Sequence, residues 1–137
     1  MADHLWTALA SIAALLTYFS MALAVGHART KYDVAAPAIS GHPDFERVFR
    51  VQANTLEWLP IFLVSLWLFS FYVSDIGAAA WGVVWIIGRV LYLVGYSKEA
   101  SARSRGFLVQ ALATAVLLFW SLGVILWRLV QTFMGHG

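Results

Sequence analysis

Four polar side chains share one face of a stretch that leads directly into an apolar segment, residues 59–71. Their spacings of three, four and three residues bring them together at about 3.6 residues per turn; they are Arg47, Arg50, Asn54 and Glu57. Charge at membrane depth is costly and is kept where it lines a cavity or finds a partner. Guanidiniums with one amide and one carboxylate suit a small polyanionic zwitterion, whose carboxylates would meet the arginines and whose ammonium would meet Glu57.

A second polar stripe lies on the next apolar segment, where Arg89, Tyr92 and Tyr96 are spaced by three and four residues. A short hinge, residues 74–77, joins the two segments and forces an antiparallel hairpin, so both stripes should end at the same mouth. The tyrosine phenols would steady a developing anion. Two plainer interpretations stay open, namely ion pairs that only fix helix register and tyrosines that belong to an interfacial belt.

The composition places these stripes in an integral membrane protein. Of 137 residues, 61% are hydrophobic and 12% are charged, and the mean hydropathy is +0.77, so too few polar side chains exist to cover a surface in water. A bilayer core of about 30 Å needs about 20 helical residues. We predict a single domain, an all-α, antiparallel four-helix transmembrane bundle, with helices near residues 5–25, 43–73, 77–96 and 105–130.

The basic residues predict the orientation of this bundle. They gather in two connections, the first with Arg29, Lys31, Arg47 and Arg50 and the second with Lys98, Arg103 and Arg105. The hinge between the two polar stripes carries only the charge of Asp75. By the positive-inside rule, both basic connections and the polar mouth should face the cytoplasm, with both termini on the other side. We expect a multi-pass protein of a bacterial inner membrane or of the endoplasmic reticulum.

Other classes of site are disfavoured by the composition. The chain has no cysteine, which excludes disulfides and cysteine nucleophiles, so any thiol must arrive with a substrate. The four histidines show no ligand spacing, and we predict no metal. A net charge of +2, without a basic run interleaved with aromatics, argues against a nucleic-acid partner.

Two motifs resemble the MAPEG superfamily, membrane-associated proteins of eicosanoid and glutathione metabolism. The first comprises Gly41, residues 45–54 (FERVFRVQAN), Glu57 and Pro60, and the second is residues 88–96 (GRVLYLVGY). The resemblance extends over about residues 28–105 and includes the four-helix topology and the loop lengths. It is closest to the branch of microsomal glutathione transferases and leukotriene-C synthase.

That resemblance implies a homotrimer with glutathione sites between neighbouring subunits, open to the cytoplasm. The positions that match glutathione-holding residues of the branch are Arg29, Arg50, Gln52, Asn54, Glu57, Tyr92 and Tyr96, with Gln52 reaching from the adjoining chain. Arg103 matches the arginine proposed to stabilise the glutathione thiolate. To this set we add Arg89 from the second stripe and Trp58, which stands where leukotriene-C synthase has a tyrosine and keeps the stacking area without the phenol.

Residues and resemblance together lead to one hypothesis, a membrane-bound glutathione transferase with glutathione as co-substrate. Arg103 would favour the thiolate, and hydrophobic electrophiles would reach it from the lipid bilayer, so that proximity completes the catalysis. A glutathione peroxidase activity towards lipid hydroperoxides stays open. Two rivals also stay open: a non-catalytic lipid-binding scaffold resembling the lipoxygenase-activating protein, and a small proton-coupled exporter with Glu57 as its carrier.

Overall fold

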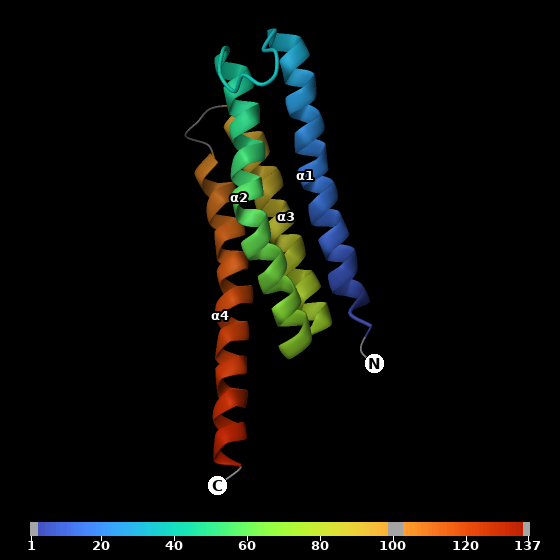
Figure 1. Cartoon of the computed structure of the whole chain (residues 1–137), viewed down its shortest axis with the longest axis vertical. Coiled ribbons are helices and arrows are strands. Elements are labelled where there is room, and N and C mark those ends of the chain that lie inside the picture. Colours follow the sequence, from blue (N-terminus) through green and yellow to red (C-terminus); the bar gives the residue numbers. More distant parts are fainter. Residues whose placement is uncertain (1–2, 99–102, 136–137) are drawn as a thin grey trace.

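The computed structural model describes residues 3–98 and 103–135, and in this part of the chain it contains four helices and no strand. They are α1 (Leu5–Tyr32), α2 (Pro43–Tyr72), α3 (Asp75–Lys98) and α4 (Ser104–Met134). Each helix is long and apolar enough to cross a membrane. The helices run lengthwise, and α4 extends furthest beyond the α2–α3 hairpin (Figure 1). The predicted all-α, four-helix transmembrane bundle is confirmed.

α2 begins where the sequence predicted. His42 precedes the helix, and its Nδ1 accepts a hydrogen bond from the Asp44 backbone N–H at 3.1 Å. Pro43 occupies the first turn, where its missing N–H is not needed, and the acidic Asp44 and Glu46 complement the positive end of the helix dipole. The helix then continues through Pro60, so the polar residues of the first motif lie on one unbroken helix.

α1 extends beyond its predicted end near residue 25 and continues to Tyr32. The prediction followed hydropathy, whereas a helix needs only its own backbone hydrogen bonds and can continue after the apolar segment ends. It stops at Asp33, which is left-handed and donates its N–H to the Arg29 carbonyl. The Arg29 guanidinium in turn donates to the Ala38 carbonyl at 2.7 Å. This bond holds the α1–α2 connection against the end of α1.

The core lies along α3, which packs against the other three helices. Trp85 is fully buried and stacks on Phe62 of α2, with ring centroids 4.1 Å apart and 7° between the planes. Small and aliphatic side chains of the other helices close around this pair, namely Ala10, Ala14, Leu66 and Leu117. Large apolar side chains cover the outside of the bundle, as a lipid environment permits.

Two glycines let α3 and α4 approach each other closely. A Cβ atom on Gly106 would lie 2.2 Å from the Tyr92 backbone nitrogen, and one on Gly88 would lie 2.6 Å from the Gln110 backbone nitrogen. Helices in membranes associate largely through such close packing of small residues, because lipid is as apolar as the helix surface. The contact therefore fixes how near Tyr92 lies to α4.

At the far end of the bundle from the α1–α2 connection, Asp75 caps a helix other than its own. Its carboxylate accepts hydrogen bonds from the backbone N–H of Thr7 at 2.8 Å, from that of Trp6 at 3.3 Å, and from the Thr7 hydroxyl at 2.7 Å. His4, which precedes α1, makes no capping bond with its side chain. Asp75 thus takes the place of a local N-cap and ties α1 to the α2–α3 hairpin.

We expect Gly106→Ala to lower the melting temperature in detergent, because the added methyl group meets backbone atoms that cannot turn aside. Overpacking of this kind costs about 1–3 kcal/mol. Gly123→Ala is the matched control, since a Cβ there meets nothing within 4 Å and alanine favours the helix. Equal melting temperatures for the two variants would show that the α3–α4 contact is not tight.

Removing the Asp75 carboxylate should loosen the first turn of α1. Asp75→Ala is expected to lower the free energy of unfolding by about 1 kcal/mol, the usual loss for an N-cap. The Thr7 amide proton should then exchange faster with solvent. Asp75→Asn keeps an oxygen acceptor, so its free energy of unfolding and its Thr7 exchange rate should lie between those of the intact protein and Asp75→Ala. Unchanged exchange at Thr7 in Asp75→Ala would contradict the capping role.

Candidate functional site

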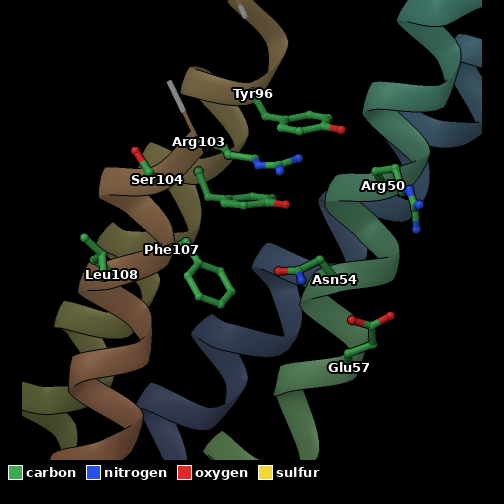
Figure 2. Close-up of a pocket in the computed structure, with 9 residues that line it drawn as sticks. Arg50, Asn54, Glu57, Tyr96, Arg103, Ser104, Phe107 and Leu108 are labelled. Carbon is green, nitrogen blue, oxygen red and sulfur yellow. The ribbon is translucent and has the colours of Figure 1, made fainter. Parts of the chain in front are cut away.

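A cavity of about 580 Å³ opens between α2 and the start of α4, with α3 as its inner wall (Figure 2). It lies towards the end of the bundle that carries the α1–α2 connection (Figure 1). Its lining residues are Arg50, Asn54 and Glu57 from α2, Tyr92 and Tyr96 from α3, and Arg103, Ser104, Phe107 and Leu108 at the start of α4. The fold therefore brings most of the two polar stripes together in one cavity, and only Arg47 and Arg89 of these stripes do not line it.

α2 supplies the charged wall of the cavity, with Arg50, Asn54 and Glu57 following one another along the helix (Figure 2). The side chains of Arg50 and Glu57 are exposed, and that of Asn54 is half-buried. Neither charge has an ion-pair partner within residues 3–98 and 103–135. Arg47, by contrast, pairs with Asp44 one turn earlier and does not line this cavity. Both charges in the wall are therefore available to a ligand.

α3 contributes a pair of stacked tyrosines, and Arg103 lies against them. The rings of Tyr92 and Tyr96 are 5.7 Å apart between centroids, with 9° between their planes. The Arg103 guanidinium carbon lies 5.4 Å from the centre of the Tyr96 ring, and Figure 2 shows its side chain beside Tyr96, reaching across towards α2. In a cation–π contact the flat face of the guanidinium lies against the ring, so its N–H groups stay free to donate hydrogen bonds.

Arg89 does not line the cavity but lies directly behind it. Its side chain is fully buried, and one terminal nitrogen donates to the Asn54 Oδ1 at 2.8 Å and to the Thr55 Oγ1 at 3.2 Å. The guanidinium carbon lies 5.1 Å from the Tyr92 ring centre and 5.6 Å from that of Trp85. Arg89 therefore reaches the cavity through Asn54 and Tyr92. Sequence reasoning had not singled out the Thr55 hydroxyl.

Two further lining residues, Phe107 and Leu108, form an apolar side to the cavity that sequence reasoning missed. Leu108 is 67% exposed, so this side opens outward. Trp58 does not line the cavity itself, but its ring packs edge-on against Phe107, with centroids 5.5 Å apart and 86° between the planes. The available signal was position, because these residues follow Arg103 by about one helical turn.

The lining thus combines two guanidiniums, one carboxylate, one amide, one serine hydroxyl and two phenols with an apolar flank. Such a site can hold a small ligand that carries both charges, and it can place that ligand beside an apolar one. No group of three or more histidine, aspartate or glutamate side chains that could hold a metal ion occurs in the described part of the chain.

A sequence profile of the MAPEG family matches residues 7–123. The chain belongs to the MAPEG family. The matched range includes every residue of the cavity lining and parts of all four helices. The resemblance found in the two sequence motifs is thereby confirmed, and with four membrane-length apolar helices this MAPEG protein is a multi-pass integral membrane protein.

Individual relatives are similar over most of the chain. The chain is 46% identical to the uncharacterized protein sll1147 of Synechocystis over 129 residues, which is 94% of each chain. It is 46% identical to microsomal glutathione S-transferase 2 of Homo sapiens over 109 residues, 79% of this chain and 73% of that one. It is 38% identical to leukotriene C4 synthase of Cavia porcellus over 104 residues, 76% of this chain and 68% of that one.

Besides Arg89 and Trp58, two further predicted binding residues, Arg29 and Gln52, do not line the cavity of this MAPEG chain. Arg29 holds the α1–α2 connection, and its guanidinium carbon lies 5.0 Å from the centre of the Phe45 ring. Gln52 is half-buried on a different face of α2, about 200° from Arg50 at the helical angle. Their part in ligand binding stays a prediction.

Proposed function

We propose that the protein is a membrane-bound glutathione transferase, which joins the glutathione sulfur to hydrophobic electrophiles. The observation that carries this proposal is the cavity in which Arg50 and Arg103 accompany a single carboxylate, Glu57. Glutathione has two carboxylates, one ammonium and one thiol, so its charges match these side chains in number and sign. The similarity to microsomal glutathione S-transferase 2 supports the same reading.

In this proposal, Arg50 pairs with a glutathione carboxylate and Glu57 pairs with the ammonium group. Asn54 and the phenols of Tyr92 and Tyr96 form hydrogen bonds with the remaining polar atoms of the tripeptide. A ligand that replaces water at both charges of the wall would resolve their lack of ion-pair partners in the described residues. Glutathione is a co-substrate here, and no metal takes part.

Arg103 is our proposed catalytic residue. A nearby guanidinium lowers the pKa of the glutathione thiol because it stabilises the anionic thiolate. The thiol proton leaves to solvent, the thiolate attacks the electrophilic carbon, and a carbon–sulfur bond forms as the leaving group departs with the bonding electrons. No covalent intermediate with the protein is required, because the site supplies thiolate and proximity.

The apolar flank of Phe107 and Leu108 is the proposed entry side for the electrophile. Hydrophobic compounds concentrate in the bilayer, and the exposed Leu108 faces outward from the bundle surface. Lipid hydroperoxides would arrive by the same route. In that peroxidase reaction two glutathione molecules are oxidised to the disulfide, and the hydroperoxide is reduced to an alcohol and water.

The sidedness and assembly of the protein are also proposals. The two basic connections support a cavity mouth at the cytoplasm and both termini across the membrane, in either a bacterial inner membrane or the endoplasmic reticulum. We further propose a homotrimer in which Gln52 and Arg29 of one subunit reach the glutathione held by its neighbour. The exposure of Arg50 and Glu57 on a single chain supports this arrangement, because a neighbour would complete the site.

Arg103→Ala should lower turnover of a chlorodinitrobenzene-type electrophile about a hundredfold, since loss of one preorganised donor to an anion costs about 10²–10³ in rate. The ultraviolet absorbance of bound thiolate should fall with it. Arg105→Ala is the matched control, because Arg105 is exposed nearby and does not line the cavity. Unchanged turnover in Arg103→Ala would refute its role. An intact protein that shows no turnover and no glutathione binding by calorimetry would instead favour the lipid-binding scaffold.

Sites shared between subunits predict complementation. Gln52→Ala should weaken glutathione binding about tenfold, the loss of one charge-assisted hydrogen bond. Mixed trimers of Arg103→Ala and Gln52→Ala subunits should then contain some sites with both residues intact, and these sites should turn over at the normal rate and normal glutathione affinity. Native mass spectrometry verifies the mixing. Verified mixed trimers that lack any normal site, or a monomeric protein, would contradict the shared site.

A further inference from the structure

A partly buried hydrogen bond decides which way the Asn54 side chain faces. Arg89 donates to the atom of Asn54 that lies 2.8 Å away. A guanidinium has five N–H donors and no acceptor, so the atom facing it must be the amide oxygen. The amide nitrogen of Asn54, with two hydrogens, is then the atom left for the cavity that Asn54 lines.

Hydrogen bonds of the neighbouring Thr55 help to hold the Arg89 guanidinium against Asn54. Arg89 also donates to the Thr55 Oγ1 at 3.2 Å, and the Thr55 hydroxyl donates onward to the Val51 carbonyl at 2.7 Å. Because the Thr55 proton is already used, the hydroxyl can only accept from Arg89. One terminal nitrogen of the guanidinium is therefore held by two acceptors, and it cannot turn away from Asn54 without breaking both bonds.

Burial of the Arg89 guanidinium costs folding free energy, as the burial of charges at functional sites commonly does. The side chain is fully buried, has no carboxylate partner among the residues that the structure describes, and leaves two nitrogens without a hydrogen-bond partner. A buried charge without a counter-charge usually destabilises a protein, and an apolar side chain of similar size is often tolerated better. A role in the neighbouring cavity would explain why a buried arginine occupies this position.

We propose that Arg89 is a positioning residue that fixes the Asn54 amide with its nitrogen turned into the cavity, so that Asn54 donates to an oxygen of the ligand. This inference rests on the proposed glutathione site and makes it more specific. With Asn54 committed as a donor, Glu57 is the one lining group that can only accept. The cavity then selects a ligand that is rich in carboxylate or carbonyl oxygens and carries one cationic group.

The chain offers a clean probe of this orientation, because Asn54 is its only asparagine. Selective ¹⁵N-asparagine labelling gives a single side-chain amide signal from the protein in detergent or nanodiscs. In the ligand-free protein this amide should be ordered by its bond to Arg89. Addition of reduced glutathione should shift both amide proton resonances, since both the nitrogen and its hydrogens face the ligand.

Arg89→Met is the decisive variant, because methionine fills a similar space without charge or donors. We expect a melting temperature equal to or above that of the intact protein, an Asn54 amide that becomes mobile, and glutathione binding weakened about tenfold by calorimetry. If Arg89 is a positioning residue, its loss weakens glutathione binding without lowering the melting temperature. If its role were only structural, binding and melting temperature would fall together. Arg128→Met is the matched control, since Arg128 lies near the far end of α4 and should leave binding and the Asn54 signal unchanged.

A double variant tests whether the effect passes through Asn54. Asn54→Ala should weaken glutathione binding about as much as Arg89→Met, and the two changes together should weaken it no further, since coupled residues are not additive. Additive losses, or an amide as ordered in Arg89→Met as in the intact protein, would overturn the proposal. Because the amide order is measured without ligand, this result differs from a failure of the intact protein to bind glutathione, which would overturn the proposed function.

Asn54→Asp gives a second, independent reading should Arg89→Met not fold. The new carboxylate would pair with Arg89, which should raise the melting temperature, and its outer oxygen would face the cavity as an acceptor. Glutathione binding should fall below that of Asn54→Ala, because an anion now opposes the ligand oxygen. Binding by Asn54→Asp as tight as in the intact protein would overturn the donor role of Asn54.

Discussion

A charged side chain inside a membrane bundle must be satisfied by protein or ligand, because lipid offers neither a counter-charge nor a hydrogen bond. α2 and α3 meet this constraint together. α2 carries Arg50 and Glu57 to an open cavity, and α3 encloses Arg89 between aromatic rings and the Asn54 amide. Within the described part of the chain, Arg50 and Glu57 have no ion-pair partner, so this cavity suits a zwitterionic, oxygen-rich ligand.

The bundle holds this cavity open through contacts made elsewhere. Gly88 and Gly106 bring the backbones of α3 and α4 together, and the stacked Trp85 and Phe62 fix α2 against α3 below the site. All lining residues except Arg103 lie on helices, and Arg103 immediately precedes α4, so the helix positions set most of the cavity walls, which suits the proposed glutathione site. At the far end of the bundle, the Asp75 carboxylate accepts a hydrogen bond from the Thr7 N–H and so ties the α2–α3 hairpin to the start of α1.

Much of the architecture could be predicted from the sequence because length and hydropathy identify membrane helices. The start of α2 was predictable from its proline and acidic first turn, whereas the end of α1 was not, because helical hydrogen bonding outlasts hydropathy. Helical spacing also joined Arg50 to Glu57 correctly. It could not tell that Arg89 lies behind the cavity wall, or that Phe107 lines it, since both depend on how far α3 and α4 rotate and how closely they pack.

The most direct test of the account is a structure of the protein with reduced glutathione bound. We predict glutathione in the cavity between α2 and α4, with its ammonium at Glu57, a carboxylate at Arg50, an oxygen accepting from the Asn54 nitrogen, and the sulfur facing Arg103. Glutathione bound outside this cavity would contradict the account. So would a ligand whose sulfur lies away from Arg103 and whose ammonium does not meet Glu57.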